Sequence, residues 1–237
     1  MMLAPRIAAR SRTLAALRLR ESSLNIALYY APISCSMVPY IALTEAGADF
    51  EVRTINFMKG MHVAEDFLRM NPKHAVPVLV VDDRPLTENV AILQWIADAF
   101  PAARLLPQNG WSRFQCVSLL AWFASGIHPF LTPNVMPQRY CDIPGTEDGV
   151  RRAAHKMLTE KLQVAEAMLA NREWFMDFFT IADAYFFWCF RRMTQFQVDV
   201  TPFANCGAHF ERVSKRPSVV KLLAFEAQTL AEFKKAS

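Results

Sequence analysis

The residue with the clearest chemical potential is Cys35, in the run Tyr30-Ala31-Pro32-Ile33-Ser34-Cys35-Ser36. An apolar, strand-like segment ends just before this run, and a helical pattern begins just after it. A thiol at the start of a helix lies near free backbone N–H groups and the positive end of the helix dipole, which stabilise a thiolate. Cys35 is therefore a candidate nucleophile or redox thiol, although cysteines are also common as inert buried residues. Ser34 offers a hydroxyl at the same turn.

Two further segments could hold a small polar ligand. Pro77 opens an apolar strand, where a proline can adopt the cis form and leave the backbone of Val76 free to pair with an extended peptide. Glu88 and Asn89 precede a helical pattern. The Glu88 carboxylate could bind an ammonium group of a ligand, and the free N–H groups at the helix start could bind a ligand carboxylate. The simpler interpretations are an edge-strand proline and an ordinary helix cap.

The elements that must position these residues alternate along the first half of the chain. We expect strands at 25–31, 50–54, 78–81 and 85–87, and helices at 39–46, 64–70 and 91–99. This β-α-β-α-β-β-α order is that of a thioredoxin-like layer. Two prolines then interrupt residues 101–110, and the rest reads as helices at 111–126, 149–169, 180–194, 204–213 and 219–233. The sequence predicts an α/β domain at 24–100, a linker at 101–110 and an all-α domain at 111–237.

Charge and hydropathy exclude several classes of partner. Five arginines lie in the first twenty residues, so the remaining 21 basic and 22 acidic residues nearly balance. A neutral body without a basic stripe argues against nucleic-acid binding. The longest apolar run, 184–190, is far shorter than the ~20 residues of a membrane span. The five cysteines and five histidines show no metal-ligand spacing, so no metal is expected.

Residues 1–23 form a basic extension, which we expect to be disordered and exclude from fold reasoning. Its arginine-rich and acid-poor composition resembles a mitochondrial transit peptide. An upstream start codon or a bacterial extension is the simpler explanation, so we favour a cytoplasmic location over a mitochondrial one.

Taken together and in this order, the three segments resemble the N-terminal domain of the glutathione transferase superfamily, closest to the bacterial beta class. The run Phe179-Thr180-Ile181-Ala182-Asp183 is similar to the capping box and staple of the superfamily's central C-terminal helix. The beta class carries Gly-Ala-Cys-Ser where this chain has Ile33-Ser34-Cys35-Ser36, and a second-domain histidine that matches His128. The resemblance implies a thioredoxin-like domain for glutathione and a helical domain for the second substrate.

The resemblance implies a role for each matched residue. Cys35 would contact the glutathione sulfur or form a mixed disulfide with it, and His128 would hydrogen-bond near the thiolate. Ser34 is the alternative, because related classes use a serine hydroxyl at this turn. The residues expected to hold the rest of glutathione are Val76, Pro77, Glu88, Asn89 and Lys59, and those expected to line the pocket for a hydrophobic electrophile are Met37, Phe130 and Met136.

The expected function is a glutathione transferase, with glutathione as co-substrate and with possible thiol–disulfide activity through Cys35. Family members are mostly homodimers, so we expect a homodimer, with no nucleic acid and no membrane as partner. Asn89, Ala121 and Pro129 depart from the family pattern. The alternative is therefore a non-catalytic member that serves as a dimerisation or partner-docking module.

Overall fold

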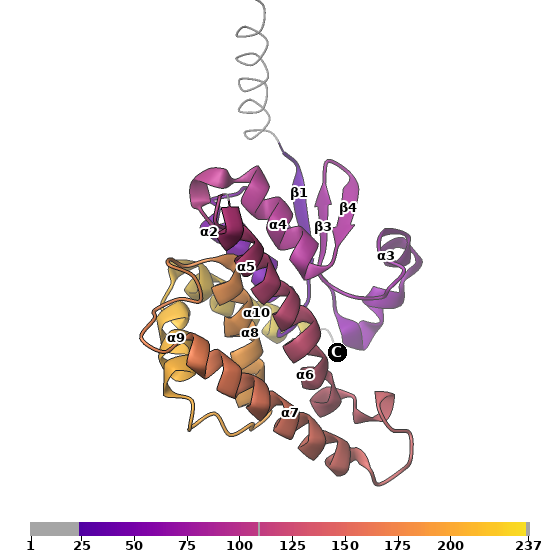
Figure 1. The fold of residues 1–237 in the computed structure, drawn as a ribbon. Coiled ribbons are helices and arrows are strands. Elements are labelled where there is room, and N and C mark those ends of the chain that lie inside the picture. Colours follow the sequence, from indigo (N-terminus) through magenta and orange to yellow (C-terminus); the bar gives the residue numbers. More distant parts are fainter. Residues whose placement is uncertain (1–23, 109, 236–237) are drawn as a thin grey trace, which may run out of the picture.

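The computed structural model describes residues 24–108 and 110–235. Two modules lie side by side in Figure 1: a sheet with its helices, coloured indigo to magenta, and a bundle of helices, coloured crimson to yellow. The predicted basic extension, residues 1–23, lies outside the described residues.

The first module is built on a mixed sheet in the order β2-β1-β3-β4. β1 pairs with β2 in parallel and with β3 in antiparallel orientation, and β3 and β4 form a hairpin. Asp82 and Asp83 turn this hairpin with φ of 46° and 64°, the left-handed region that two-residue hairpin turns require. The strands are β1 (Ile26–Tyr30), β2 (Glu51–Thr54), β3 (Val78–Val81) and β4 (Arg84–Thr87).

Three helices complete the predicted β-α-β-α-β-β-α order: α2 (Met37–Glu45), α3 (Glu65–Met70) and α4 (Asn89–Ala99). Every residue of α2 from Met37 to Leu43 is buried, because this helix contacts both α4 and the helices α8 and α10 of the second module. Short 3-10 turns, η1 (Phe57–Lys59), η2 (Met61–Val63) and η3 (Pro101–Ala103), connect the larger elements. The thioredoxin-like layer is therefore confirmed.

The second module is helical, as predicted, but it has a helix that the sequence analysis did not separate. The helix expected at 111–126 continues through a π-helical turn, Phe123–Ile127, into α6. Pro129 is accommodated at the start of α6, where a missing N–H costs little. The helices are α5 (Gly110–Trp122), α6 (His128–Val135), α7 (Glu147–Met168), α8 (Ile181–Gln195), α9 (Ala204–Ser214) and α10 (Pro217–Lys235), with a 3-10 turn η5 (Pro137–Arg139).

The central helix α8 begins with the predicted capping box. The Thr180 hydroxyl accepts from the backbone N–H of Ala182, and the Asp183 carboxylate accepts from the N–H of Thr180 at 2.7 Å. Asp183 also accepts from Phe175 N and from His209 Nε2, both at 3.0 Å. The carboxylate therefore satisfies the helix start and joins α8 to α9 and to the loop before it.

One hydrophobic core runs through both modules without a break. It joins buried residues of β1 and α2 to residues of α5, α7 and α8, among them Leu28, Met37, Leu120, Leu162 and Phe186. The stretch Gly110–Val135 is long and apolar enough to cross a bilayer by length and composition, with a mean hydropathy of 1.3. Here it contains α5, the π turn and α6 and packs on α4, α7 and α8, and 28% of the apolar window is buried.

Candidate active site

The turn that carries Cys35 is closed by its own serines. The Ser34 hydroxyl donates to the Ala31 carbonyl at 2.8 Å and lies 2.6 Å from the Ser36 hydroxyl. Ser36 Oγ in turn accepts from the N–H of Ala31 at 3.0 Å. Both hydroxyls therefore hold the turn between β1 and α2.

Ile33 passes through this turn in the left-handed region, with φ of 68°. A β-branched residue is strained there, whereas glycine is not. Contacts from the helical module hold the strained residue at both of its peptide groups. Glu226 of α10 accepts from Ile33 N at 2.7 Å, and Trp188 Nε1 of α8 donates to Ile33 O at 3.0 Å.

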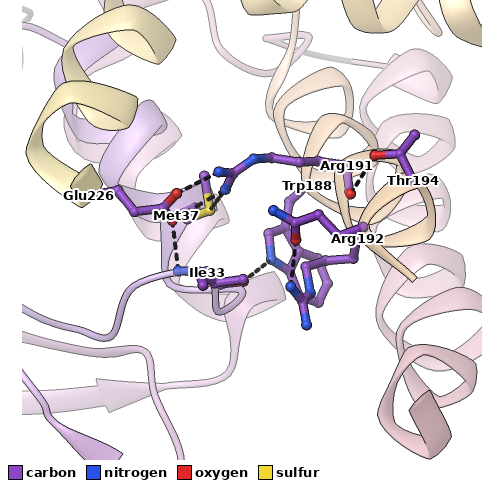
Figure 2. Close-up of polar contacts among 8 residues, drawn as sticks. Ile33, Met37, Trp188, Arg191, Arg192, Thr194 and Glu226 are labelled. Atoms are coloured by element: carbon purple, nitrogen blue, oxygen red, sulfur yellow. Dashed lines mark hydrogen bonds and ion pairs between the residues drawn. The ribbon is translucent and has the colours of Figure 1, made fainter. Parts of the chain in front are cut away.

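A buried ion pair supports this clamp, as Figure 2 shows. The Arg191 guanidinium binds both carboxylate oxygens of Glu226, at 2.5 and 3.2 Å, and also lies 3.2 Å from Met37 Sδ. The two side chains are only 18% and 4% exposed, so water screens the pair weakly. The helical domain therefore sets the shape of the turn that presents Cys35.

Cys35 is buried at 9% exposure, and its Sγ lies 3.5 Å from the carbonyl oxygen of Val76. Burial raises the pKa of the Cys35 thiol to about 12. The expectation that the helix start would hold Cys35 as a thiolate is therefore wrong for the ligand-free protein. Desolvation of the charged form outweighs the hydrogen bonds that favour it.

Val76 and Pro77 lie beside Cys35 at the start of β3. The bond between them is cis, the form that the sequence analysis anticipated. Asn71 Nδ2 donates to the carbonyl of Ala75 at 2.7 Å and so braces the loop that leads to this bond. Asn71, Ala75, Val76 and Pro77 all line the cavity next to Cys35.

Glu88 and Asn89 face the same cavity from the start of α4. The Glu88 side chain is 69% exposed and forms an ion pair with Lys73, whose ammonium also donates to the Thr87 hydroxyl. Asn89 is buried, and its Nδ2 donates to the Cys35 carbonyl at 3.1 Å. Its Oδ1 is buried without a partner among the described residues.

His128 reaches the cavity from the π turn. This turn inserts an extra residue per turn, a feature frequent at functional sites, and it ends directly before His128. It also needs a glycine, because a Cβ on Gly126 would lie 2.6 Å from Trp122 Cδ1. The Trp188 ring packs edge-on against the imidazole, with centroids 4.5 Å apart. Burial lowers the pKa of His128 to about 4, so the imidazole is neutral near pH 7.

Two adjoining cavities meet at His128 and Ala124. The first, of about 170 Å³, is bounded by both modules and is lined by Cys35, Asn71, Ala75, Val76, Pro77, Glu88, Asn89, Val90, Ala124, His128 and Tyr185. The second is an open groove of about 440 Å³ lined by Ala124, His128, Pro129, Thr132, Arg139 and Tyr140. The imidazole therefore stands between a thiol-bearing cavity and a wider surface groove.

Five of the predicted site residues lie outside both sets of lining residues, and Ser34, whose hydroxyl donates to the Ala31 carbonyl, is one of them. Met37 is fully buried in the core against Arg191, so its predicted place in an electrophile pocket is wrong. Phe130 and Met136 are partly buried on or just after α6, beside the groove rather than in its lining. Lys59 is exposed on η1 and does not line the cavity.

Sequence reasoning missed two residues that the fold brings to the cavity region. Tyr185 lines the first cavity, and its hydroxyl lies 3.4 Å from His128 Nδ1. It stands two residues after Asp183 in a run that was interpreted as a folding motif only. Lys73 binds Glu88 across a gap of fifteen positions, and its place after Asn71-Pro72 was the only local signal.

Known proteins share this arrangement. The family model "Glutathione S-transferase, N-terminal domain" matches residues 25–98. The glutathione S-transferase GstA of Escherichia coli O157:H7 is 33% identical over 203 residues, which cover 84% of this chain and 98% of that protein. A sphingomonad glutathione S-transferase complexed with glutathione is 31% identical over 85% of this chain and 98% of that one, with a TM-score of 0.76.

A bacterial beta class glutathione S-transferase from Sphingomonas chungbukensis is 32% identical, covers 84% of this chain and 98% of its own, and has a TM-score of 0.76. Sequence and structure thus match over nearly the whole length of these relatives, in both modules. The chain belongs to the glutathione S-transferase family and resembles its bacterial beta class.

Proposed function

We propose that this protein is a glutathione transferase, which binds glutathione, stabilises its thiolate and transfers it to a hydrophobic electrophile. The observation that carries the proposal is the cavity lined by Cys35, Val76, Glu88, Asn89 and His128. It combines a thiol, a strand edge, a carboxylate and an imidazole from two modules of a glutathione S-transferase chain.

The γ-glutamyl and cysteinyl parts of glutathione have chemically matched groups. Glu88 attracts the γ-glutamyl ammonium, and the backbone N–H groups of Asn89 and of the N-terminus of α4 donate to the γ-glutamyl carboxylate. The backbone of Val76 pairs with the tripeptide, so the cysteinyl sulfur is directed to Cys35 and His128. Lys73 forms an ion pair with Glu88 and so orients its carboxylate at the mouth of the cavity.

The groove beside His128 is the place for the electrophile. It adjoins the cavity through Ala124 and His128, so a molecule in the groove approaches the sulfur directly. The Arg139 guanidinium lines this groove and makes no hydrogen bond or ion pair within residues 24–108 and 110–235. An electrophile with a carboxylate or another anionic group beside its apolar part fits this lining.

Calorimetry with glutathione, followed by turnover of 1-chloro-2,4-dinitrobenzene, tests the function. We expect binding and turnover, with Glu88→Gln weakening glutathione binding about tenfold, because the carboxylate that attracts the γ-glutamyl ammonium is lost. Glu65→Gln, on exposed α3, is the matched control and should change neither. Binding without turnover of any electrophile would instead favour the non-catalytic docking module.

Thiol–disulfide exchange through Cys35 is a second activity of the same site. The neighbouring cavity would admit glutathione disulfide, but the raised pKa of Cys35 makes the resting thiol a slow nucleophile. Incubation with glutathione disulfide and peptide mass spectrometry would locate an adduct. A reversible adduct on Cys35 supports the exchange reaction, and an unmodified Cys35 leaves transfer as the function.

We also propose a homodimer. Trp111 and Phe114, at the start of α5, are 75% and 66% exposed, and their rings pack together with centroids 6.3 Å apart. An aromatic pair exposed to this extent is typical of protein interfaces.

A further inference from the structure

The first cavity is lined by one hydroxyl, that of Tyr185, to which no role has yet been assigned. Tyr185 is 1% exposed, yet it lines the cavity together with Cys35 and His128. Its Oη lies 3.4 Å from His128 Nδ1, near enough for a weak hydrogen bond. It comes from α8, two residues after the carboxylate that caps this helix, so its position is tied to the most strongly anchored element of the module.

The other donors near the sulfur position are already engaged. The Ser34 hydroxyl donates a hydrogen bond to the Ala31 carbonyl, and Ser34 does not line the cavity. The Cys35 thiol points to the Val76 carbonyl, and a thiol is a weak donor in any case. Asn89 Nδ2 is used by the carbonyl of Cys35.

We propose that the Tyr185 hydroxyl donates a hydrogen bond to the glutathione thiolate, while His128 Nδ1–H donates to Tyr185 Oη. This inference rests on the proposed binding of glutathione. A hydroxyl can donate once and accept at the same time, so both contacts are compatible. The thiol proton leaves to water when glutathione ionises, and Tyr185 keeps its own proton throughout.

The electrostatics of the site suit this role. Burial raises the pKa of Tyr185 far above its ordinary value, and the nearby Cys35 thiol adds to the effect, so the phenol stays protonated. His128, with its pKa lowered to about 4, stays neutral and retains one ring N–H as a donor. A hydrogen bond from a neutral donor to an anion is stronger than one between neutral groups, and it lowers the pKa of the thiol.

The test is a titration of bound glutathione, with the thiolate followed by its ultraviolet absorbance, in the wild type and in Tyr185→Phe. We expect the variant to raise the thiol pKa by about one unit, which is tenfold less thiolate at neutral pH. S-methylglutathione, which has no ionisable thiol, should bind both proteins equally. Tyr29→Phe is the matched control, since its hydroxyl accepts from Arg53 outside the cavity, and should not change the thiol pKa.

The variant Cys35→Ala distinguishes this proposal from the role that the family resemblance implies, in which Cys35 contacts the glutathione sulfur. A larger rise in the thiol pKa in Cys35→Ala than in Tyr185→Phe, or no rise in Tyr185→Phe, overturns the proposal. If circular dichroism shows that Tyr185→Phe does not fold, Tyr185→Met fills the same apolar space and is held to the same criterion. Failure of the wild type to bind glutathione would instead refute the proposed function itself.

Discussion

At the scale of single residues, the site is built from groups that burial keeps neutral. Burial raises the pKa of Cys35 to about 12 and lowers that of His128 to about 4. The cavity therefore contains a thiol and an imidazole that are both uncharged near pH 7. A thiolate brought by a ligand to these two groups would therefore meet neutral hydrogen-bond donors.

Cysteine labelling tests the resting state of Cys35. We expect iodoacetamide at pH 7 to modify Cys141 first, because Cys141 is partly exposed and hydrogen bonds from Thr146 and the Ile143 backbone lower its pKa. The raised pKa of Cys35 predicts slow labelling that accelerates about tenfold per pH unit toward pH 12. Peptide mass spectrometry of briefly labelled protein, with Cys141→Ser as control, measures both rates. Faster labelling of Cys35 at pH 7 would contradict its assignment as a resting thiol.

Arg139 tests the charge preference of the groove. A matched pair of electrophiles, 4-chloro-3-nitrobenzoate and neutral 1-chloro-2,4-dinitrobenzene, isolates the effect of one carboxylate. We expect Arg139→Gln to lower kcat/KM for the anionic member about tenfold relative to the neutral one, equivalent to about 1.4 kcal/mol. Arg139→Lys should restore part of the ratio, and Arg151→Gln, on α7, should leave it unchanged. An unchanged ratio in Arg139→Gln would show that the guanidinium does not contact the substrate.

At the scale of the elements, the turn between β1 and α2 depends on α8 and α10. Ile33 has a strained φ of 68°, and Glu226 and Trp188 hold its N–H and its carbonyl. The strain of such a residue persists only where its surroundings determine its conformation. The helical domain therefore holds Ile33 in a conformation that a glycine would adopt without such support.

Glu226→Gln should be among the most damaging single substitutions in this region. It removes the charge that compensates Arg191 in a nearly dry site, a change that costs roughly 3 kcal/mol or more. Urea denaturation measures the loss of stability, and turnover should fall with it because the Cys35 turn loosens. Glu65→Gln breaks an exposed ion pair with Arg69 and should cost less than about 0.5 kcal/mol. Equal effects of the two substitutions would show that the clamp contributes little.

Much of this was predictable from the sequence, for identifiable reasons. Local sequence patterns predict the strands, the hairpin turn at Asp82-Asp83 and the capping box at Thr180. The structure contains all of these features. Helix α6 was missed, because Pro129 and Pro133 are ordinarily helix breakers and the π turn that leads into it has no sequence signature of its own. The Ile33–Glu226 contact spans 193 positions and leaves no local pattern at all.

At the scale of the whole molecule, the two modules share one hydrophobic core, which joins the sheet, α2 and α8. The site is assembled across that junction, with Cys35 and Asn89 from one side and His128 and Tyr185 from the other. A change in how the modules pack therefore changes the site directly.

The assembly is tested at the exposed aromatic pair of α5. We expect the double substitution Trp111→Glu and Phe114→Glu to convert a dimer to a monomer, because it places two charges where apolar rings would be buried. Light scattering coupled to gel filtration measures the molar mass. Val220→Glu, at a 56% exposed position on α10, is the matched control and should remain dimeric. A wild type that is monomeric at all concentrations would refute the dimer itself.

The clamp on Ile33 has a consequence for the protein while it is being synthesised. Glu226 is translated after every residue that lines the cavity, so the Ile33 N–H lacks its partner while the rest of the site already exists. Nascent chains and truncations that end before α10 should contain a formed sheet and an unformed Cys35 turn. Translation of α10 is thus the step that completes this turn.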